Sequence, residues 1–136
     1  MKYTIYCDGA YSSARNTSGS GVLILRDGIE ILRFGKKFKG GTNNTAELCA
    51  AILAMRSIKL PVDEIEIISD SMYIVGTVNQ GWKRNKNKNL WLEFDRCYNS
   101  LSLLCPKIQF SWVKGHNNDK FNSIVDKLAV EASQSI

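Results

Sequence analysis

Four carboxylates of this 136-residue chain, Asp8, Glu47, Asp70 and Asp126, stand in apolar sequence surroundings. An isolated ionised carboxylate is costly to bury, so such groups are usually paired, hydrogen-bonded or bound to a metal. A helix cap or a buried ion pair would explain any one of them, Asp70 most easily. Four of them in an otherwise basic chain indicate a site for divalent cations such as Mg²⁺ or Mn²⁺, which favour oxygen ligands.

Close carboxylates repel one another, and without a cation this repulsion raises the pKa of at least one of them. Two divalent ions about 4 Å apart relieve the repulsion, and they can activate a water and stabilise the leaving oxygen of an in-line phosphoryl transfer. The chemistry that these residue types predict is therefore metal-assisted phosphoryl transfer.

The charge pattern points to a polyanionic partner. Lys and Arg number 18 against 13 Asp and Glu, a formal net charge of +5. Basic residues interleaved with aromatic ones cluster at 33–39 and 82–88. Solvated loops would explain one such cluster. Two of them fit a polyanion better, because cations contact phosphates and rings pack on sugars or bases.

Length and composition predict one domain over residues 1–136 with a real core, since 44% of the residues are hydrophobic. No stretch approaches the roughly 20 apolar residues of a membrane span. Residues 1–4 lead into a strand-like pattern rather than a signal peptide. The 4 cysteines form no CxxC pair, which disfavours a zinc site. We therefore expect a cytoplasmic protein with reduced cysteines, no membrane partner and a site that a monomer completes.

Hydrophobic periodicity and turn signals predict an α/β fold with the element order βββαβααβα. Asp27-Gly28 predicts a tight hairpin, and residues 42–44 are good caps for the first helix. Short loops make the first three strands antiparallel, and helical crossovers place the last two parallel to the first, in a mixed five-stranded sheet flanked by helices. The expected strands span about 2–8, 20–26, 29–38, 63–69 and 108–113, and the expected helices about 44–58, 71–79, 90–104 and 121–133.

The four acids can converge in this architecture. Asp8 and Asp70 stand at the ends of the first and fourth strands, so their side chains meet if those strands are neighbours. Glu47 and Asp126 lie on helix faces that should pack on the sheet. These faces carry Ala50, Ala51, Ala54 and Ile58 in the first helix and Ala129 and Val130 in the last.

Five short segments, spread from the first strand to the last helix, form a specific combination although each is weak alone. They are YCDGA (6–10), TNNTAEL (42–48), SDSMY (69–73), WVKGH (112–116) and NSIVDKLA (122–129). In this order the segments resemble ribonuclease H of type 1. The resemblance implies the ribonuclease H-like fold, with the element order predicted above.

The resemblance also implies an activity. Members of this family are metal-dependent endoribonucleases that hydrolyse the RNA strand of RNA–DNA hybrids with two Mg²⁺ ions, leaving 3′-hydroxyl and 5′-phosphate ends; Mn²⁺ is a possible substitute. By resemblance, Asp8, Glu47, Asp70 and Asp126 are the metal ligands. His116 matches a loop histidine linked to proton transfer or product release, although a lone surface histidine is often inert.

The resemblance assigns substrate contacts as well. Asn43 and Asn44 are helix caps by composition and minor-groove contacts by resemblance, and both roles can hold because a helix N-terminus favours phosphate. Thr42 resembles the start of a pocket for a DNA-strand phosphate. Trp82 could pack on DNA sugars or, equally, belong to the core. Hybrid recognition should depend on shape, phosphates and 2′-hydroxyls. The further substrate contacts expected are Gly9, Lys83 and Asn122.

Two segments depart from the family pattern. Residues 11–19 lack the glycine- and proline-rich turn of many members. Residues 80–90 are short where bacterial members often insert a helix and a basic loop. Only Lys83, Arg84, Lys86 and Lys88 remain there, which predicts weaker hybrid affinity with the chemistry intact.

Two alternatives compete with a hybrid-specific nuclease. A resolvase-like or integrase-like nuclease would share the fold, but the TNN, WVKGH and DKLA segments argue against it. A non-catalytic hybrid-binding module would be favoured by the loss of an acid, whereas all four are present. Primer removal, R-loop clearance and a role in a virus or mobile element are all compatible with the leading interpretation.

Overall fold

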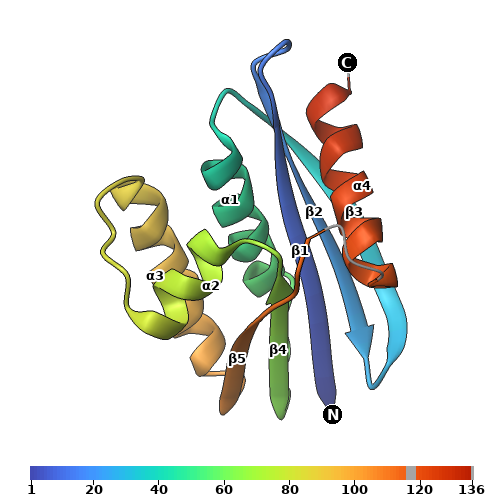
Figure 1. The fold of residues 1–136 in the computed structure, drawn as a ribbon. Helices are drawn as coiled ribbons and strands as arrows, with labels where there is room; N and C mark the ends of the chain where they lie inside the picture. Colours follow the sequence, from blue (N-terminus) through green and yellow to red (C-terminus); the bar gives the residue numbers. More distant parts are fainter. Residues whose placement is uncertain (116–118, 136) are drawn as a thin grey trace.

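A computed structural model describes residues 1–115 and 119–135 of the chain (Figure 1). The order of its elements matches the predicted βββαβααβα. The strands are β1 (Lys2–Ser12), β2 (Thr17–Arg26), β3 (Ile29–Lys39), β4 (Glu64–Ser69) and β5 (Lys107–Trp112). The helices are α1 (Asn43–Arg56), α2 (Met72–Gln80), α3 (Lys88–Ser102) and α4 (Lys120–Gln134).

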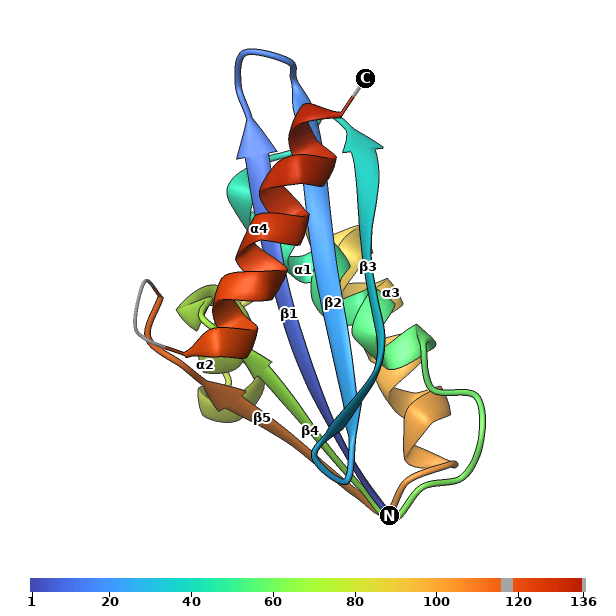
Figure 2. The ribbon, with the colours of Figure 1, turned by 90° about the vertical axis from the view of Figure 1, so that its right-hand side faces the viewer.

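The strands form one mixed sheet in the order β3-β2-β1-β4-β5. The first three strands are antiparallel, and β4 and β5 run parallel to β1, as predicted. Helix α4 covers one face over β1, β2 and β3, while α1 and α3 lie behind the opposite face (Figure 2). The neighbouring parallel pair β1 and β4 is the arrangement that brings the first and fourth strand ends together.

Local chemistry explains the first turn and the first cap. Asp27 and Gly28 both have positive φ, 48° and 86°, as a tight two-residue hairpin requires. The Thr42 hydroxyl accepts from the Thr45 backbone N–H at 3.1 Å, and the Thr45 hydroxyl accepts from the Thr42 N–H at 2.8 Å. This reciprocal pair satisfies two donors at the start of α1, so the expected cap is present.

The first hairpin is longer than the sequence pattern predicts. The expected strands 2–8 and 20–26 are too short, because β1 and β2 stay paired as far as Ser12 and Thr17. The glycines there look like strand breakers, but they make room for helices. A Cβ on Gly19 would lie 2.1 Å from the Ala129 carbonyl oxygen, so only glycine lets α4 lie this close to β2.

Alternation along β1 divides the apolar residues into two layers. Ile5 and Cys7 belong to the core between the sheet and α1 and α3, whereas Tyr6 packs with Val125 under α4. Asp8 follows the same alternation and therefore leaves the strand on the α4 side. No helix among the described residues is long and apolar enough to cross a membrane.

Candidate active site

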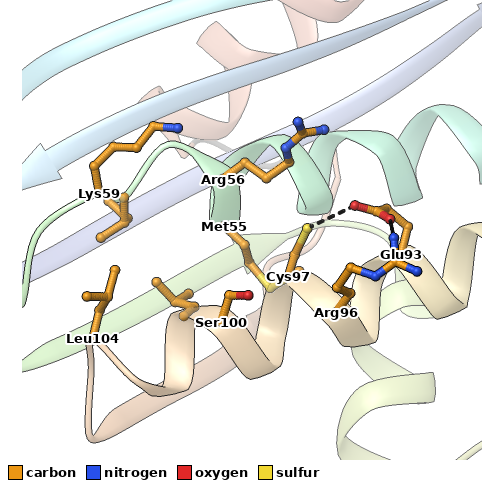
Figure 3. Close-up of a pocket in the computed structure, with 10 residues that line it drawn as sticks. Met55, Arg56, Lys59, Glu93, Arg96, Cys97, Ser100 and Leu104 are labelled. Atoms are coloured by element: carbon orange, nitrogen blue, oxygen red, sulfur yellow. Dashed lines mark hydrogen bonds and ion pairs between the residues drawn. The ribbon is translucent and has the colours of Figure 1, made fainter.

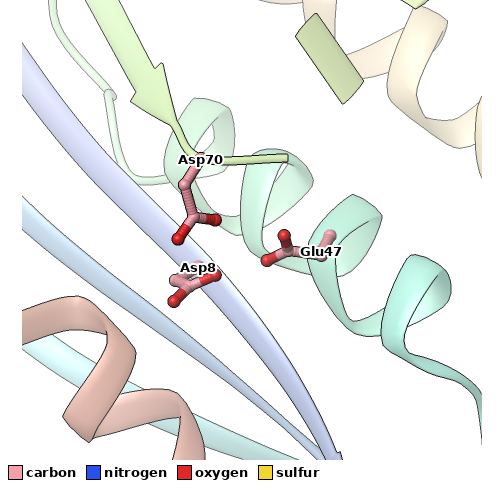
Figure 4. A group of neighbouring side chains, drawn as sticks. All are labelled: Asp8, Glu47 and Asp70. Atoms are coloured by element: carbon pink, nitrogen blue, oxygen red, sulfur yellow. The ribbon is translucent and has the colours of Figure 1, made fainter. Parts of the chain in front are cut away.

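Three of the four predicted acids lie together (Figure 4). Asp8, Glu47 and Asp70 each offer a carboxylate oxygen, and these oxygens all lie within 4.8 Å of one another. The parallel pairing of β1 and β4 explains why Asp8 and Asp70 meet. The last paired residues of the two strands are Tyr6 and Ile68, and each lies two positions before its aspartate. Glu47 completes the group from the first half of α1.

Gly9 is the position that lets α1 reach this edge. Beyond Tyr6, β1 is no longer paired with β4, so the Gly9 N–H is free to donate to side chains. It donates to Asp8 Oδ1 at 2.9 Å and also to Glu47 Oε1. A Cβ on Gly9 would lie 2.2 Å from the Ala46 carbonyl carbon and 2.3 Å from the Glu47 nitrogen. Any larger residue would therefore push α1, and Glu47 with it, away from the strand. In the structure Gly9 thus contacts the acid cluster itself.

Two of the clustered acids, Asp8 and Glu47, have raised pKa values. Asp8 is only 4% exposed, and burial raises its pKa to about 11, with further contributions from Glu47 and Asp70. Burial also raises the pKa of Glu47 to about 7, helped by the charge of Asp70 and opposed by hydrogen bonds that include those from Gly9 and Ser71. Without a cation the cluster therefore retains protons at neutral pH. A divalent cation would supply the positive charge that those protons provide.

Asp126 lies outside this group of three but on the adjoining helix. It is partly buried on α4. The carbonyl of the preceding Val125 would lie 2.5 Å from a Cβ on Gly21, and Gly21 is the residue paired with Asp8 across β1 and β2. Because Asp8 leaves the strand toward α4, the two aspartates occupy the same side of the sheet.

Asp70 has two side-chain contacts that the sequence did not predict, with Asn122 and Trp112. Asn122 is 3% exposed, and its Nδ2 donates to Asp70 Oδ2 at 3.4 Å, while its Oδ1 is buried without a hydrogen-bond partner among the described residues. Trp112 Nε1 donates to the Asp70 carbonyl at 3.1 Å. Both residues belong to segments noted in the sequence, WVKGH and NSIVDKLA. Their contacts with Asp70, more than 40 positions away, become visible only in the fold.

His116 lies outside the described residues. The preceding residue, Gly115, lies beside the acids, because a Cβ there would lie 3.1 Å from Asp70 Oδ2.

The TNN segment surrounds an open pocket. Thr42, Asn43 and Asn44 line a hollow of about 430 Å³ together with Lys86 and Asn87. Asn43 Oδ1 also accepts from the Tyr11 N–H at 3.1 Å, which fixes the start of α1 against β1. The two asparagines are exposed. The expected capping therefore belongs to Thr42, and the asparagine side chains remain accessible.

The basic loop between α2 and α3 offers fewer free cations than the sequence suggests. Arg84 forms an ion pair with Asp95 at 2.6 Å and lies 4.5 Å over the Trp91 ring, so it packs the loop onto α3. Lys83 is exposed. Trp82 is 45% exposed, and its ring covers Gly76 of α2, where a Cβ would lie 2.4 Å from the ring. One face of Trp82 is thus packed and part of it is open.

Comparison with known proteins identifies the family. The family model for RNase H matches residues 1–134. A ribonuclease H from Trichodesmium erythraeum (strain IMS101) is 36% identical over 146 residues, which cover 98% of this chain and 89% of the relative. One from Clostridium botulinum (strain Hall) is 35% identical, with coverage of 96% and 95%. The chain belongs to the ribonuclease H family and is therefore a hydrolase that acts on the RNA of hybrids.

Solved structures agree with this fold. RNase H1 from the halophilic archaeon Halobacterium salinarum NRC-1 superposes with a TM-score of 0.79 at 24% identity, covering 97% of both chains. LC11-RNase H1, solved in complex with an RNA/DNA hybrid, gives a TM-score of 0.78 at 26% identity, with coverage of 96% and 95%. The resemblance noted in the sequence and the predicted fold class are both confirmed.

Proposed function

We propose that this chain is a metal-dependent endoribonuclease that hydrolyses the RNA strand of RNA–DNA hybrids by two-metal-ion catalysis, leaving 3′-hydroxyl and 5′-phosphate ends. The observation that carries the proposal is the group formed by Asp8, Glu47 and Asp70, whose carboxylate oxygens lie within 4.8 Å of one another. Family membership supports the substrate class, as does a structural relative solved with an RNA/DNA hybrid.

The donor set fits Mg²⁺, with Mn²⁺ as a substitute. All three clustered side chains present oxygen, and burial makes the negative charges of Asp8 and Glu47 unfavourable without a cation. The buried Asn122 Oδ1 adds an acceptor without a partner among the described residues, beside the same group. Asp126 is the proposed fourth ligand, from the α4 side. Bound ions would activate a water and stabilise the leaving oxygen of the RNA strand.

Surrounding residues hold these acids in place. The Gly9 N–H donates to both Asp8 and Glu47, and Trp112 donates to the backbone of Asp70. Fixed carboxylates lower the reorganisation needed as charge develops in the reaction. For His116 we propose proton transfer or assistance to product release.

Recognition of the hybrid is proposed to run along the start of α1. Asn43 and Asn44 would contact the minor groove. Thr42 would form the start of a pocket for a DNA-strand phosphate, which Lys86 also lines. The open part of Trp82 and the exposed Lys83 would meet the DNA strand, while Gly9 and Asn122 would lie closest to the RNA. Such contacts read shape, phosphates and 2′-hydroxyls, so sequence preference should be weak.

We also propose that residues 1–136 act as one catalytic domain, as a monomer and in the cytoplasm. Asp8, Glu47 and Asp70 come from one chain and meet without a second copy.

Cleavage of end-labelled substrates tests the function. The protein should cut the RNA strand of a hybrid, but neither duplex DNA nor duplex RNA, with Mg²⁺ or Mn²⁺, and EDTA or Asp70→Asn should abolish cutting. Glu131→Gln, which removes an exposed acid of α4, is the matched control and should cut normally. Tight hybrid binding without cleavage in either metal would instead support the non-catalytic module.

A further inference from the structure

Three adjoining hollows extend from the start of α1 toward the end of the first hairpin. The first is the TNN pocket described above. The second, of about 300 Å³, is floored by Gly40 and Gly41 and shares Phe38 and Lys39 with the third. The third, of about 470 Å³, lies between the β1–β2 turn and the end of β3. Among the described residues, no Asp or Glu lines any of the three.

The third hollow carries three exposed cations, Arg15, Lys37 and Lys39, which we call the hairpin patch. None of them has an ion pair with an acid in the described part of the chain. Lys37 donates to the Ser135 carbonyl at 2.6 Å, which holds its ammonium in place and leaves two further N–H groups. Within residues 1–115 and 119–135, the patch is therefore a positive surface that no acid neutralises.

The hairpin patch is attached to the loop that leads into the active site. The Gly40 N–H donates to the Asn16 carbonyl at 2.8 Å, and Tyr11 Oη donates to Asn16 Oδ1 at the same distance. The first bond ties the β1–β2 turn to the β3–α1 loop, and the second lies within the first hairpin. The turn and the loop lie at one end of the molecule in two views (Figures 1 and 2). A Cβ on Gly40 would meet nothing within 4 Å, so the space beside this glycine is open.

A second group of cations lines the groove between α1 and α3, but its charge is partly balanced. Arg56, Lys59 and Arg96 surround a hollow of about 280 Å³ with an apolar floor (Figure 3). Glu93 also lines it and pairs with Arg96 at 2.7 Å. This groove serves as a control, because it offers the same number of cations away from the acid cluster.

We propose that the hairpin patch binds backbone phosphates of the hybrid duplex beyond the TNN pocket, and so compensates for the short basic loop between α2 and α3. The proposal rests on the proposed function. Across the sheet Lys39 is level with Ser12, because both pair with Thr17. Ser12 follows Asp8 by four residues of β1, or about 13 Å of extended chain. At roughly 3.4 Å of helix axis per nucleotide, the patch lies about four base pairs from the acids. A duplex that runs along β1 and extends about four base pairs past the acids would therefore reach the patch.

Salt-dependent binding tests this proposal, measured in an Asp70→Asn background so that the substrate stays intact. The patch variant combines Arg15→Ala, Lys37→Ala and Lys39→Ala, and the control combines Arg56→Ala, Lys59→Ala and Arg96→Ala. Each is measured on a hybrid that only covers the acids and the TNN pocket, and on one extended by about five base pairs at both ends. If the triple patch variant fails to fold, the double variant Arg15→Gln and Lys39→Gln keeps the contact of Lys37 with α4.

On the extended hybrid, the patch variant should flatten the slope of log affinity against log salt by about two to three, and the control by less than one. On the short hybrid neither should change it. With Asp70 restored, the patch variant should raise KM for the extended hybrid and keep kcat. Equal slopes for parent and patch variant, or equal changes in patch and control, would overturn the proposal. If the parent fails to cleave any hybrid with Mg²⁺, the proposed function itself fails, which is a distinguishable result.

Discussion

The raised pKa values in the acid cluster predict that the metal-free protein loses stability as pH rises. Burial lifts the pKa of Asp8 to about 11 and that of Glu47 to about 7, whereas the unfolded chain has ordinary carboxyl groups. The folded state therefore binds more protons than the unfolded state above roughly pH 4, and stability falls with pH in that window. Below it, both states are protonated and the full stability is present.

The size of this loss of stability follows from the number of protons that the folded state retains. Each proton held by the folded state and lost by the unfolded one costs about 1.4 kcal/mol per pH unit. One proton retained between pH 5 and pH 7 lowers the free energy of unfolding by up to about 3 kcal/mol. Asp8→Asn replaces the most strained carboxyl with a neutral group of the same shape. It should raise the metal-free stability at pH 7 by roughly 1–3 kcal/mol.

Urea unfolding in EDTA at about pH 5 and pH 7 measures both effects. The parent should lose stability over this range and regain it with Mg²⁺ at the higher pH, while Asp8→Asn should show a shallower pH dependence. Glu131→Gln, on an exposed side chain, should behave like the parent. A variant Asp8→Asn that is less stable than the parent at pH 7, with an unchanged pH slope, would refute the view that the cluster is strained.

Three further substitutions test the supports of the site. Gly9→Ala places a Cβ within 2.3 Å of the Glu47 backbone. It should lower the free energy of unfolding by about 1–3 kcal/mol in urea and remove most of the hybrid-cleavage activity. Full activity would contradict this prediction. Asn122→Ala should lower kcat roughly tenfold with little change in stability, and an unchanged kcat would mean that its contact does not position the acid. Arg84→Ala should destabilise the protein by about 1 kcal/mol, whereas the matched Lys83→Ala should leave its melting temperature unchanged; equal effects would reverse the assignment of Arg84 to packing.

Local signals predicted the elements well and their lengths less well. The hairpin at Asp27-Gly28 and the capped start of α1 were correct because turn and cap preferences depend on a few neighbouring residues. The end of β1 was placed too early, at 8 instead of Ser12, and the start of β2 too late, at 20 instead of Thr17, because Gly19 and its neighbours suggest a break. Their role is to admit α4, a packing partner more than 100 residues away in the chain.

For the candidate site too, some features were visible in the sequence and others only in the fold. The unusual setting of its acids was visible in the sequence, because a carboxylate among apolar residues is an energetic anomaly wherever it occurs. The pairing of the loop charges was not visible: Arg84 was counted with Lys83, Lys86 and Lys88 among the cations left for binding the hybrid, but it forms an ion pair with Asp95 on α3. Whether a surface cation is free depends on which acid the fold brings beside it.

The sequence by itself determined the residue types of the site, the order of the elements and the family, since these depend on side-chain chemistry and on periodicities within short segments. Only the tertiary structure decided that Asp8, Glu47 and Asp70 meet, that Asp126 lies on the neighbouring helix, and that the buried Asn122 donates to Asp70. The register of β1 against β4 and the close approach of α1 over Gly9 set these positions. Both arise from contacts between segments far apart in the chain, which no local pattern encodes.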